Sequence, residues 1–298
     1  MKVALCFFGM PPMKCNKNER VIKDLSLKLW KKNVIDPNNV DIFIHCWDKN
    51  DEEGLKDKYN PKKSIFEDHI VFDKNHPIKY DYEDGGGTTL NMFLSQAYSA
   101  KKSIELKRQF EKENGFIYDI VMMSRMDCLW FKSPDLKNLN PKKFYVSNWN
   151  QTRSGRDSDK PFGIKSNITT ERRNYKKILD YWFISNSKYI DKFSQLYDFI
   201  PEWNTLLEKN IQQDIHKCWD LLEKRIFPKK LLKLYKRSGF SNHSLKKDFL
   251  EHLGLWDKVE FKYYEHHHHN LQRYFYRWKD YKRHKKLFTK SELNKLQR

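Results

Sequence analysis

The residues best suited to chemistry form the short sequence Arg125-Met126-Asp127, which follows the strongest strand signal in the chain, at 117–123. A strand that ends in a carboxylate presents it at the edge of the sheet where α/β proteins bind ligands. Mg²⁺ and Mn²⁺ prefer oxygen ligands and often use one or two protein carboxylates completed by phosphate oxygens. Asp127 is therefore a candidate metal ligand, and Arg125 a candidate partner of a phosphate or sugar hydroxyl. The alternative is an Arg–Asp ion pair that only closes the strand end.

Two other aspartates are candidates for a general base. Asp180 begins a strand-like segment at 180–185 and is our first candidate. Asp214 lies in a predicted helix around 211–224 and is the second. Either residue could instead cap a helix or lie on the surface.

Three further segments have binding potential. The sequence Gly-Gly-Gly-Thr-Thr at 85–89 precedes a helix whose N–H groups could bind phosphate, but it lacks the ending of a P-loop, which favours a flexible loop and a capped helix. Four histidines at 266–269 could bind a transition metal, although an exposed polar loop is the simpler interpretation. The basic and aromatic residues at 273–286 suit an anionic membrane, a polyanionic acceptor, nucleic acid, or an amphipathic helix docked on the core.

The elements that must position these residues alternate between strands and helices. Apolar runs at 2–8 and 40–46 predict strands, and an apolar stripe at 19–33 predicts a helix between them. Such a βαβ unit implies a parallel sheet, with a ligand site beyond the strand ends at 8–9 and 45–48. The other predicted elements are a turn at 36–39, a loop at 49–62, strands at 70–72, 143–149 and 180–185, helices at 90–113 and 187–199, and further helices between 203 and 256.

The predicted fold class is α/β: a mostly parallel, Rossmann-like nucleotide-binding sheet with helices on both faces and a helical C-terminal part. With 298 residues and 39% hydrophobic residues, the chain can bury a large core. We divide it into an α/β core at 1–200 and a helical region with the basic-aromatic tail at 201–298, packed on the core. The net charge of +19 favours anionic partners, although a solubility bias explains the same charge.

The cysteines and the N-terminus indicate an intracellular protein. Cys6, Cys46 and Cys128 lie in apolar strand-like runs, and there is no CxxC pair for structural zinc. The odd number of five cysteines fits a reducing compartment. The first apolar run is too short for a signal peptide, and no run approaches the roughly 20 apolar residues of a membrane span. We expect a cytoplasmic protein (host cytoplasm if viral), with peripheral membrane contact as the only membrane association.

The chain resembles a group of glycosyltransferases with the GT-A fold, found in bacteria and large DNA viruses. The resemblance covers about residues 1–200 and rests on the order of several motifs. They are an apolar first strand ending at Gly9, the acidic–apolar strand 41–45 ending in His, the helix sequence Ser95-Gln96-Ala97-Tyr98-Ser99, the strand Tyr118-Asp119 through Arg125-Met126-Asp127, and the later Asp180, Phe183 and Ser185. Arg125 stands where the commoner Asp-x-Asp motif has its first aspartate.

The resemblance implies a nucleotide-diphosphate-sugar donor of the UDP or GDP type, a glycan acceptor and a divalent metal, Mn²⁺ or Mg²⁺. Carried over by position, Asp127 is the metal ligand and Arg125 a donor contact. Phe8 and Gly9 line the nucleotide pocket, and Ser95, Gln96 and Ser99 face the donor. The position of Arg125 leaves open how many ligands the protein gives the metal and whether a metal is needed.

Two other functions stay open. The charge and the basic-aromatic tail would suit a nucleic-acid-binding protein, but no helix-turn-helix, RRM or zinc-finger pattern supports that partner. A relative that binds a nucleotide-sugar without turning it over would share the fold and the site. The sugar, the acceptor and the stereochemical outcome do not follow from these residues.

Overall fold

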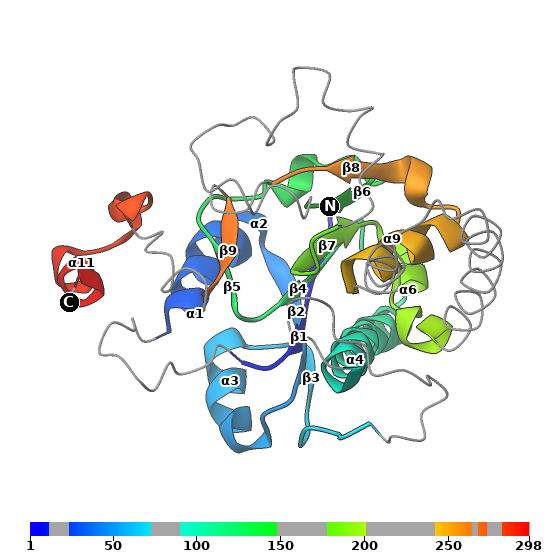
Figure 1. Cartoon of the computed structure of the whole chain (residues 1–298), viewed down its shortest axis with the longest axis horizontal. Coiled ribbons are helices and arrows are strands. Elements are labelled where there is room, and N and C mark those ends of the chain that lie inside the picture. Colours follow the sequence, from blue (N-terminus) through cyan, green and yellow to red (C-terminus); the bar gives the residue numbers. More distant parts are fainter. Residues whose placement is uncertain are drawn as a thin grey trace, which may run out of the picture.

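The computed structural model describes residues 1–11, 24–72, 90–147, 178–200, 242–263, 268–272 and 282–297. Within these residues, a seven-stranded sheet has the order β3-β2-β1-β4-β7-β6-β8 (Figure 1). Its strands are β1 (Val3–Gly9), β2 (Val40–Cys46), β3 (Lys63–Phe66), β4 (Ile120–Arg125), β6 (Phe144–Val146), β7 (Trp182–Ser185) and β8 (Val259–Phe261). The helices of eight or more residues are α3 (Glu52–Tyr59), α4 (Leu90–Asn114), α9 (Asn242–His252) and α11 (Lys290–Gln297).

Most neighbouring strands of the sheet are parallel. β1 pairs in parallel with β2 on one side and β4 on the other, β2 pairs with β3, and β6 with β8. β7 is antiparallel to both of its neighbours. The structure thus confirms the α/β class and the mostly parallel sheet that the first βαβ unit predicts.

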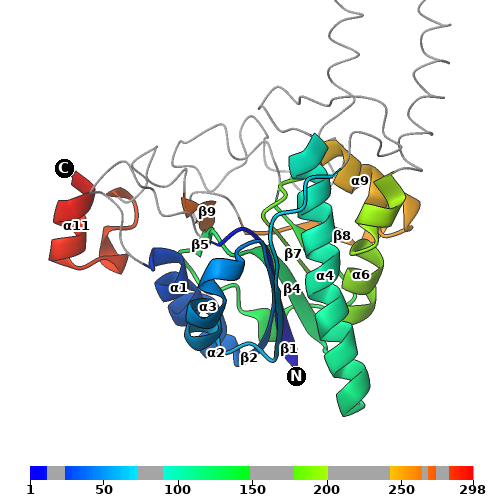
Figure 2. The same cartoon turned by 90° about the horizontal axis from the view of Figure 1, so that it is seen from below.

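Helices cover both faces of the sheet, because successive side chains of a strand point to opposite faces. Ala4, Cys6 and Phe8 of β1 are buried with residues of α4, α9 and α6 (Ser187–Phe193). Val3 and its alternate neighbours are buried on the other face, with residues of the helical stretch that starts with α1 (Leu25–Trp30) and with α3. Figure 2 shows the two layers on either side of the sheet.

A second, two-stranded sheet joins two distant parts of the chain. β5 (Cys128–Trp130) pairs antiparallel with β9 (His269–Leu271) beside the first helix (Figure 1). α11 then packs near α1, where Lys28 forms an ion pair of 2.8 Å with Glu292. The C-terminal part therefore adds strands β8 and β9 to the helices that the sequence predicts there.

Three local expectations are wrong. The charged stretch at 49–62 contains α3, whose Leu55 and Tyr59, four residues apart, are buried on one face. The third strand lies at 63–66 rather than 70–72, and Val71 is exposed. The predicted turn at 36–39 is mostly helical: α1 continues through a π-helix at Lys31–Ile35 into α2 (Asp36–Asn38), and Asn39 ends it in the left-handed conformation.

No helix among the described residues is long and apolar enough to span a membrane.

Candidate functional site

The strand order reverses between β1 and β4, and most of the predicted site residues lie at this point. From β1 the chain moves to β2 and β3 on one side, whereas β4 and the later strands lie on the other. Phe8 of β1 is paired with Arg125 of β4, so the carboxyl ends of the two strands are level. Open α/β sheets bind ligands in the crevice outside such a reversal. Gly9 ends β1 there with φ of 95°, a conformation that favours glycine.

Arg125 and Asp127 form a two-pronged ion pair at the end of β4. Nε and Nη2 of Arg125 donate to the two carboxylate oxygens of Asp127 at 2.9 and 2.8 Å. Burial by itself would lower the pKa of Arg125, but the charge and hydrogen bonds of Asp127 outweigh it and raise that pKa. The pair is partly accessible, with 21% of the Arg125 side chain and 16% of the Asp127 side chain exposed.

Asp180 lies in the same cluster, positioned by Gln96 and Lys246. Gln96, on α4, donates from Nε2 to Oδ2 of Asp180 at 2.9 Å. Lys246, on α9, donates from Nζ to Oε1 of Gln96 at 3.1 Å. An ammonium group only donates, so it fixes the amide with its NH₂ end toward Asp180. The structure thus brings Asp180 and Gln96 together with Arg125, as the sequence predicts, and adds a buried lysine from the C-terminal region.

Because Lys246 is buried, its positive charge destabilises the folded state. Burial lowers the pKa of the Lys246 ammonium to about 8; the carboxylate of Asp180 opposes this change, and the positive charge of Arg125 adds to it. The cluster therefore holds two carboxylates and two cations. Sequence reasoning missed Lys246, because it follows Leu245 and precedes Lys247 in a helix where nothing local distinguishes a buried lysine from a surface lysine.

Ser99 holds the end of β1 through a directed chain of hydrogen bonds. Its Oγ accepts from the Gly9 N–H at 2.7 Å and lies 2.7 Å from Nδ1 of His45, whose Nε2 lies 2.7 Å from Oε1 of Glu67. Burial lowers the pKa of His45, partly offset by Glu67, so the ring is neutral at pH 7. Since Glu67 accepts, Nε2 carries the proton and Nδ1 accepts from the Ser99 hydroxyl.

This chain of bonds resembles a catalytic triad in composition but not in accessibility. Ser99 and His45 are fully buried, so the serine hydroxyl does not face a ligand surface. Its role in the structure is to fix the Gly9 backbone. Ser95, one turn earlier on α4, is also buried, and its Oγ lies 3.0 Å from Nε2 of His69.

Phe8 lies inside the core rather than on a surface, with 2% of its area exposed. Together with Gln96, Met123, Phe183 and Lys246, it borders a cavity of about 20 Å³ beneath the cluster. A cavity of this size holds about one water molecule. It cannot hold a nucleotide, so a ligand of that size would lie outside the strand ends, over Gly9 and the Arg125–Asp127 pair.

The side chains near Asp127 decide whether a divalent metal ion could bind there. The described residues contain no group of three or more His, Cys, Asp or Glu side chains placed to hold a metal ion. Gln272 lies opposite Asp127, because its backbone N–H donates to the Asp127 carbonyl at 2.9 Å. Its buried Oε1 has no hydrogen-bond partner in the part of the chain that the structure describes. One carboxylate and one amide oxygen suit a hard divalent ion that takes its other ligands from phosphate and water.

The histidines at 266–269 only partly fall within the described residues. His266 and His267 lie outside them, as does Asp214. His269 is fully buried in β9, which contradicts the exposed loop expected for it. Its Nε2 lies 2.9 Å from the Tyr263 carbonyl oxygen, and its ring packs against Trp130 and Trp182. No local pattern distinguishes a run of four histidines that enters a strand from one in an exposed loop.

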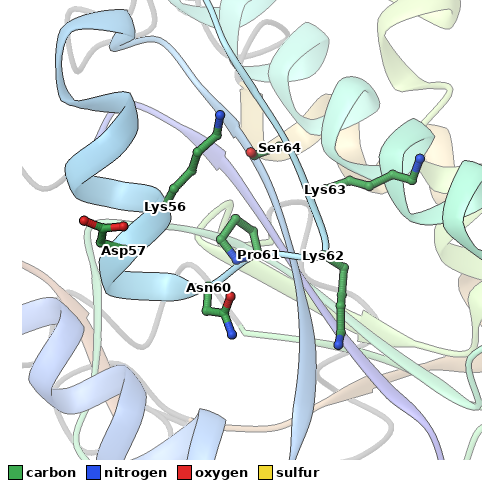
Figure 3. Close-up of a pocket in the computed structure, with 7 residues that line it drawn as sticks. All are labelled: Lys56, Asp57, Asn60, Pro61, Lys62, Lys63 and Ser64. Atoms are coloured by element: carbon green, nitrogen blue, oxygen red, sulfur yellow. The ribbon is translucent and has the colours of Figure 1, made fainter.

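A larger depression, of about 540 Å³, lies away from this cluster, between the end of α3 and the start of β3 (Figure 3). Its lysines point in different directions, as Figure 3 shows. Lys56, Lys62 and Lys63 form ion pairs with Glu52, Asp41 and Glu113 respectively. The depression therefore lacks a convergent set of polar groups, and we place the functional site at the strand reversal.

Comparison with known proteins finds similar solved structures but no family for this chain. No model of a protein family matches this chain, and no curated protein matches it. Among solved structures, the chain is similar to mouse xyloside xylosyltransferase 1 in its apo form, with 11% sequence identity and a TM-score of 0.38. The alignment covers 88% of this chain and 83% of that one. At this level of likeness no activity follows for the present chain.

Proposed function

We propose that this protein is a glycosyltransferase that moves a sugar from a nucleotide-diphosphate-sugar, of the UDP or GDP type, to a glycan acceptor with the help of a divalent metal. The observation that carries the proposal is the position of the Arg125–Asp127 pair, partly accessible at the reversal of strand order and level with Gly9. That crevice is where open α/β sheets bind nucleotides. The motif resemblance over residues 1–200 supports the same reaction.

Each residue of the cluster has a role in this reaction. Arg125 uses two of the five N–H donors of a guanidinium for Asp127, which leaves donors for a phosphate oxygen. Its charge offsets the negative charge that builds on the departing diphosphate. Asp127 would hold the metal, which when bound would supply further positive charge at the diphosphate. The Gly9 backbone, fixed by Ser99, allows close approach of the nucleotide.

Asp180 is the general base of the proposal. Its carboxylate lies in the same cluster as Arg125 and is oriented by the Gln96 amide. In an inverting reaction it would accept the proton of the acceptor hydroxyl as that hydroxyl attacks the anomeric carbon. With 7% of its surface exposed, Asp180 would reach an acceptor only at the mouth of the crevice.

The first test is calorimetric binding of UDP and of GDP to the native protein, with and without Mn²⁺. We expect one nucleotide to bind, more tightly with Mn²⁺, and Asp127→Ala to abolish the gain from Mn²⁺. Asp257→Ala, which removes an exposed aspartate in the short turn before β8, is the matched control.

Two outcomes would count against the proposal. If neither nucleotide binds under any condition, the UDP/GDP form of the proposal is wrong, and binding to nucleic acid that falls steeply with salt would favour the alternative partner. If the nucleotide binds but no donor sugar is ever released or transferred, the protein is a non-catalytic binder.

The buried Cys6, Cys46 and Cys128 are free thiols, which suits the cytoplasmic location that we also propose.

A further inference from the structure

The ribbon of β5 and β9 places Gln272 and Asp127 directly opposite each other. Cys128 is paired with Leu271, and the next pair along the ribbon is Asp127 with Gln272, joined by a hydrogen bond from the Gln272 N–H to the Asp127 carbonyl. Residues directly opposite in an antiparallel pair have Cβ atoms about 5 Å apart and point to the same face. Side chains of this length can therefore reach each other on that face.

The contacts of the neighbouring residues show on which face of the β5–β9 ribbon Asp127 and Gln272 lie. Cys128, Trp130 and Leu271 are buried in the core beneath the sheet, and His269 packs against Trp130 and Trp182. Side chains alternate along each strand, so Asp127 and Gln272 lie on the opposite face of the ribbon. His269 is consequently on the wrong face to join Asp127, and its Nε2 already lies 2.9 Å from the Tyr263 carbonyl oxygen.

Gln272 is also unusual in its hydrogen bonding. It is 6% exposed, yet its Oε1 finds no hydrogen-bond donor among the described residues. Its neighbour on the same face, Asn270, is fully buried, and its Oδ1 accepts from the Leu271 N–H at 2.8 Å. Buried amide oxygens normally have a partner, so an unpaired one on a residue opposite a carboxylate suits an electropositive ligand.

We propose that Gln272, rather than one of the histidines at 266–269, supplies a second oxygen ligand to the divalent ion that Asp127 would hold. The inference rests on the metal use in the proposed function. A neutral amide oxygen and a carboxylate whose charge is shared with Arg125 make a weak site for Mn²⁺. The site is completed by diphosphate oxygens, so metal and nucleotide each strengthen the binding of the other by the same factor.

The test is Mn²⁺ binding itself, followed by the electron paramagnetic resonance signal of the free ion, with the full chain and without any donor or acceptor. Gln272→Leu removes the oxygen while keeping the size of the side chain, and we expect Mn²⁺ affinity to fall about tenfold or more. Gln272→Glu adds a charged oxygen at the same place and should raise the affinity above that of the native protein. Asn270→Asp adds the same charge two residues away and is the matched control.

Each result bears on the proposal in a different way. Loss in Gln272→Leu with a gain in Gln272→Glu, and no comparable gain in Asn270→Asp, would support it. Equal gains in Gln272→Glu and Asn270→Asp would overturn it, because the effect would then be general attraction of the cation. If Asp127→Asn weakens Mn²⁺ binding but both Gln272 variants bind as the native protein does, Gln272 is not a ligand although Asp127 is.

One result separates this inference from the proposed function. Should the native protein bind no Mn²⁺ at millimolar concentration, either alone or with UDP or GDP, the metal site is absent and Gln272 is no ligand. If UDP or GDP nevertheless binds tightly in the same experiment, the proposed transferase function remains, but without a metal. Circular dichroism of each variant shows whether it is folded, and the gain expected in Gln272→Glu cannot come from misfolding.

Discussion

Replacement of Lys246 by methionine should change how the stability of the protein depends on pH. Lys246 is 4% exposed and donates to Gln96 at 3.1 Å. Burial lowers its pKa from 10.5 to about 8. At 1.36 kcal/mol for each pKa unit, that gap corresponds to about 3 kcal/mol by which the charged lysine destabilises the folded state.

The direction in which stability changes with pH follows from the number of protons that the folded and unfolded states bind. Below pH 8 the lysine is charged in both states, and the folded protein bears the whole cost. Between pH 8 and 10.5 the unfolded chain binds more protons than the folded one, so the native stability gains about 3 kcal/mol with rising pH through this group. Lys246→Met lacks this term, but it loses a hydrogen bond to Gln96 worth about 1 to 1.5 kcal/mol. We expect the variant to be about 1 to 2 kcal/mol more stable than the native protein at pH 7 and less stable by pH 10.5.

Urea unfolding at several pH values between 7 and 10.5 measures this difference directly, because all other titrating groups are shared and cancel. Lys247→Met is the matched control: it removes the next lysine of α9, which forms an ion pair with Glu251 near the surface. Curves for native protein and Lys246→Met that stay parallel across the whole range would refute the reasoning. They would mean that Lys246 keeps its ordinary affinity for protons despite its burial.

Two other substitutions probe the scaffold of the site. Lys107→Met should destabilise the protein by about 3 to 5 kcal/mol in urea unfolding, because it leaves the carboxylates of Glu111 and Asp191 without their buried cation. Lys101→Met, which breaks the exposed pair with Asp198 and a cation–π contact with Tyr197, should cost less than about 1 kcal/mol. Ser99→Ala should cost about 1 to 3 kcal/mol, because it removes the acceptor of the Gly9 N–H and the donor to His45. Hydrogen exchange at Gly9 should become faster in that variant, and unchanged exchange would show that Ser99 does not hold this end of β1.

The parts of the fold that the sequence predicts best are those with strong local patterns. β1 and β2 are unbroken apolar runs buried on both faces, and Gly115, with φ of 67°, follows the end of α4 as predicted. α3 was missed because only Leu55 and Tyr59 of its eight residues are buried. β3 was misplaced because it is a short edge strand, and its partly exposed residues show no apolar run.

The site residues that could be predicted from the sequence are those next to the ends of apolar strands. Asp127, Arg125 and Asp180 follow or precede apolar segments, and the structure brings them together. Lys246 and Gln272 were missed, because the C-terminal third of the chain brings them to the cluster. Only the tertiary structure shows that a lysine on α9 meets Gln96, or that Gln272 pairs with Asp127, and neither position has a local signal. The roles of all these residues in binding and catalysis stay predictions.

The ribbon of β5 and β9 also has a consequence for how the protein matures. It joins residues 128–130 to 269–271, so its contacts span about half the chain. Contacts this distant in sequence close a long loop and form late in folding. A nascent chain can therefore assemble β1, β2, β3 and β4, and expose Asp127, well before β9 has been synthesised. On a ribosome, Arg125 and Asp127 would be in place early, but Gln272 would come to lie opposite Asp127 only near the end of synthesis.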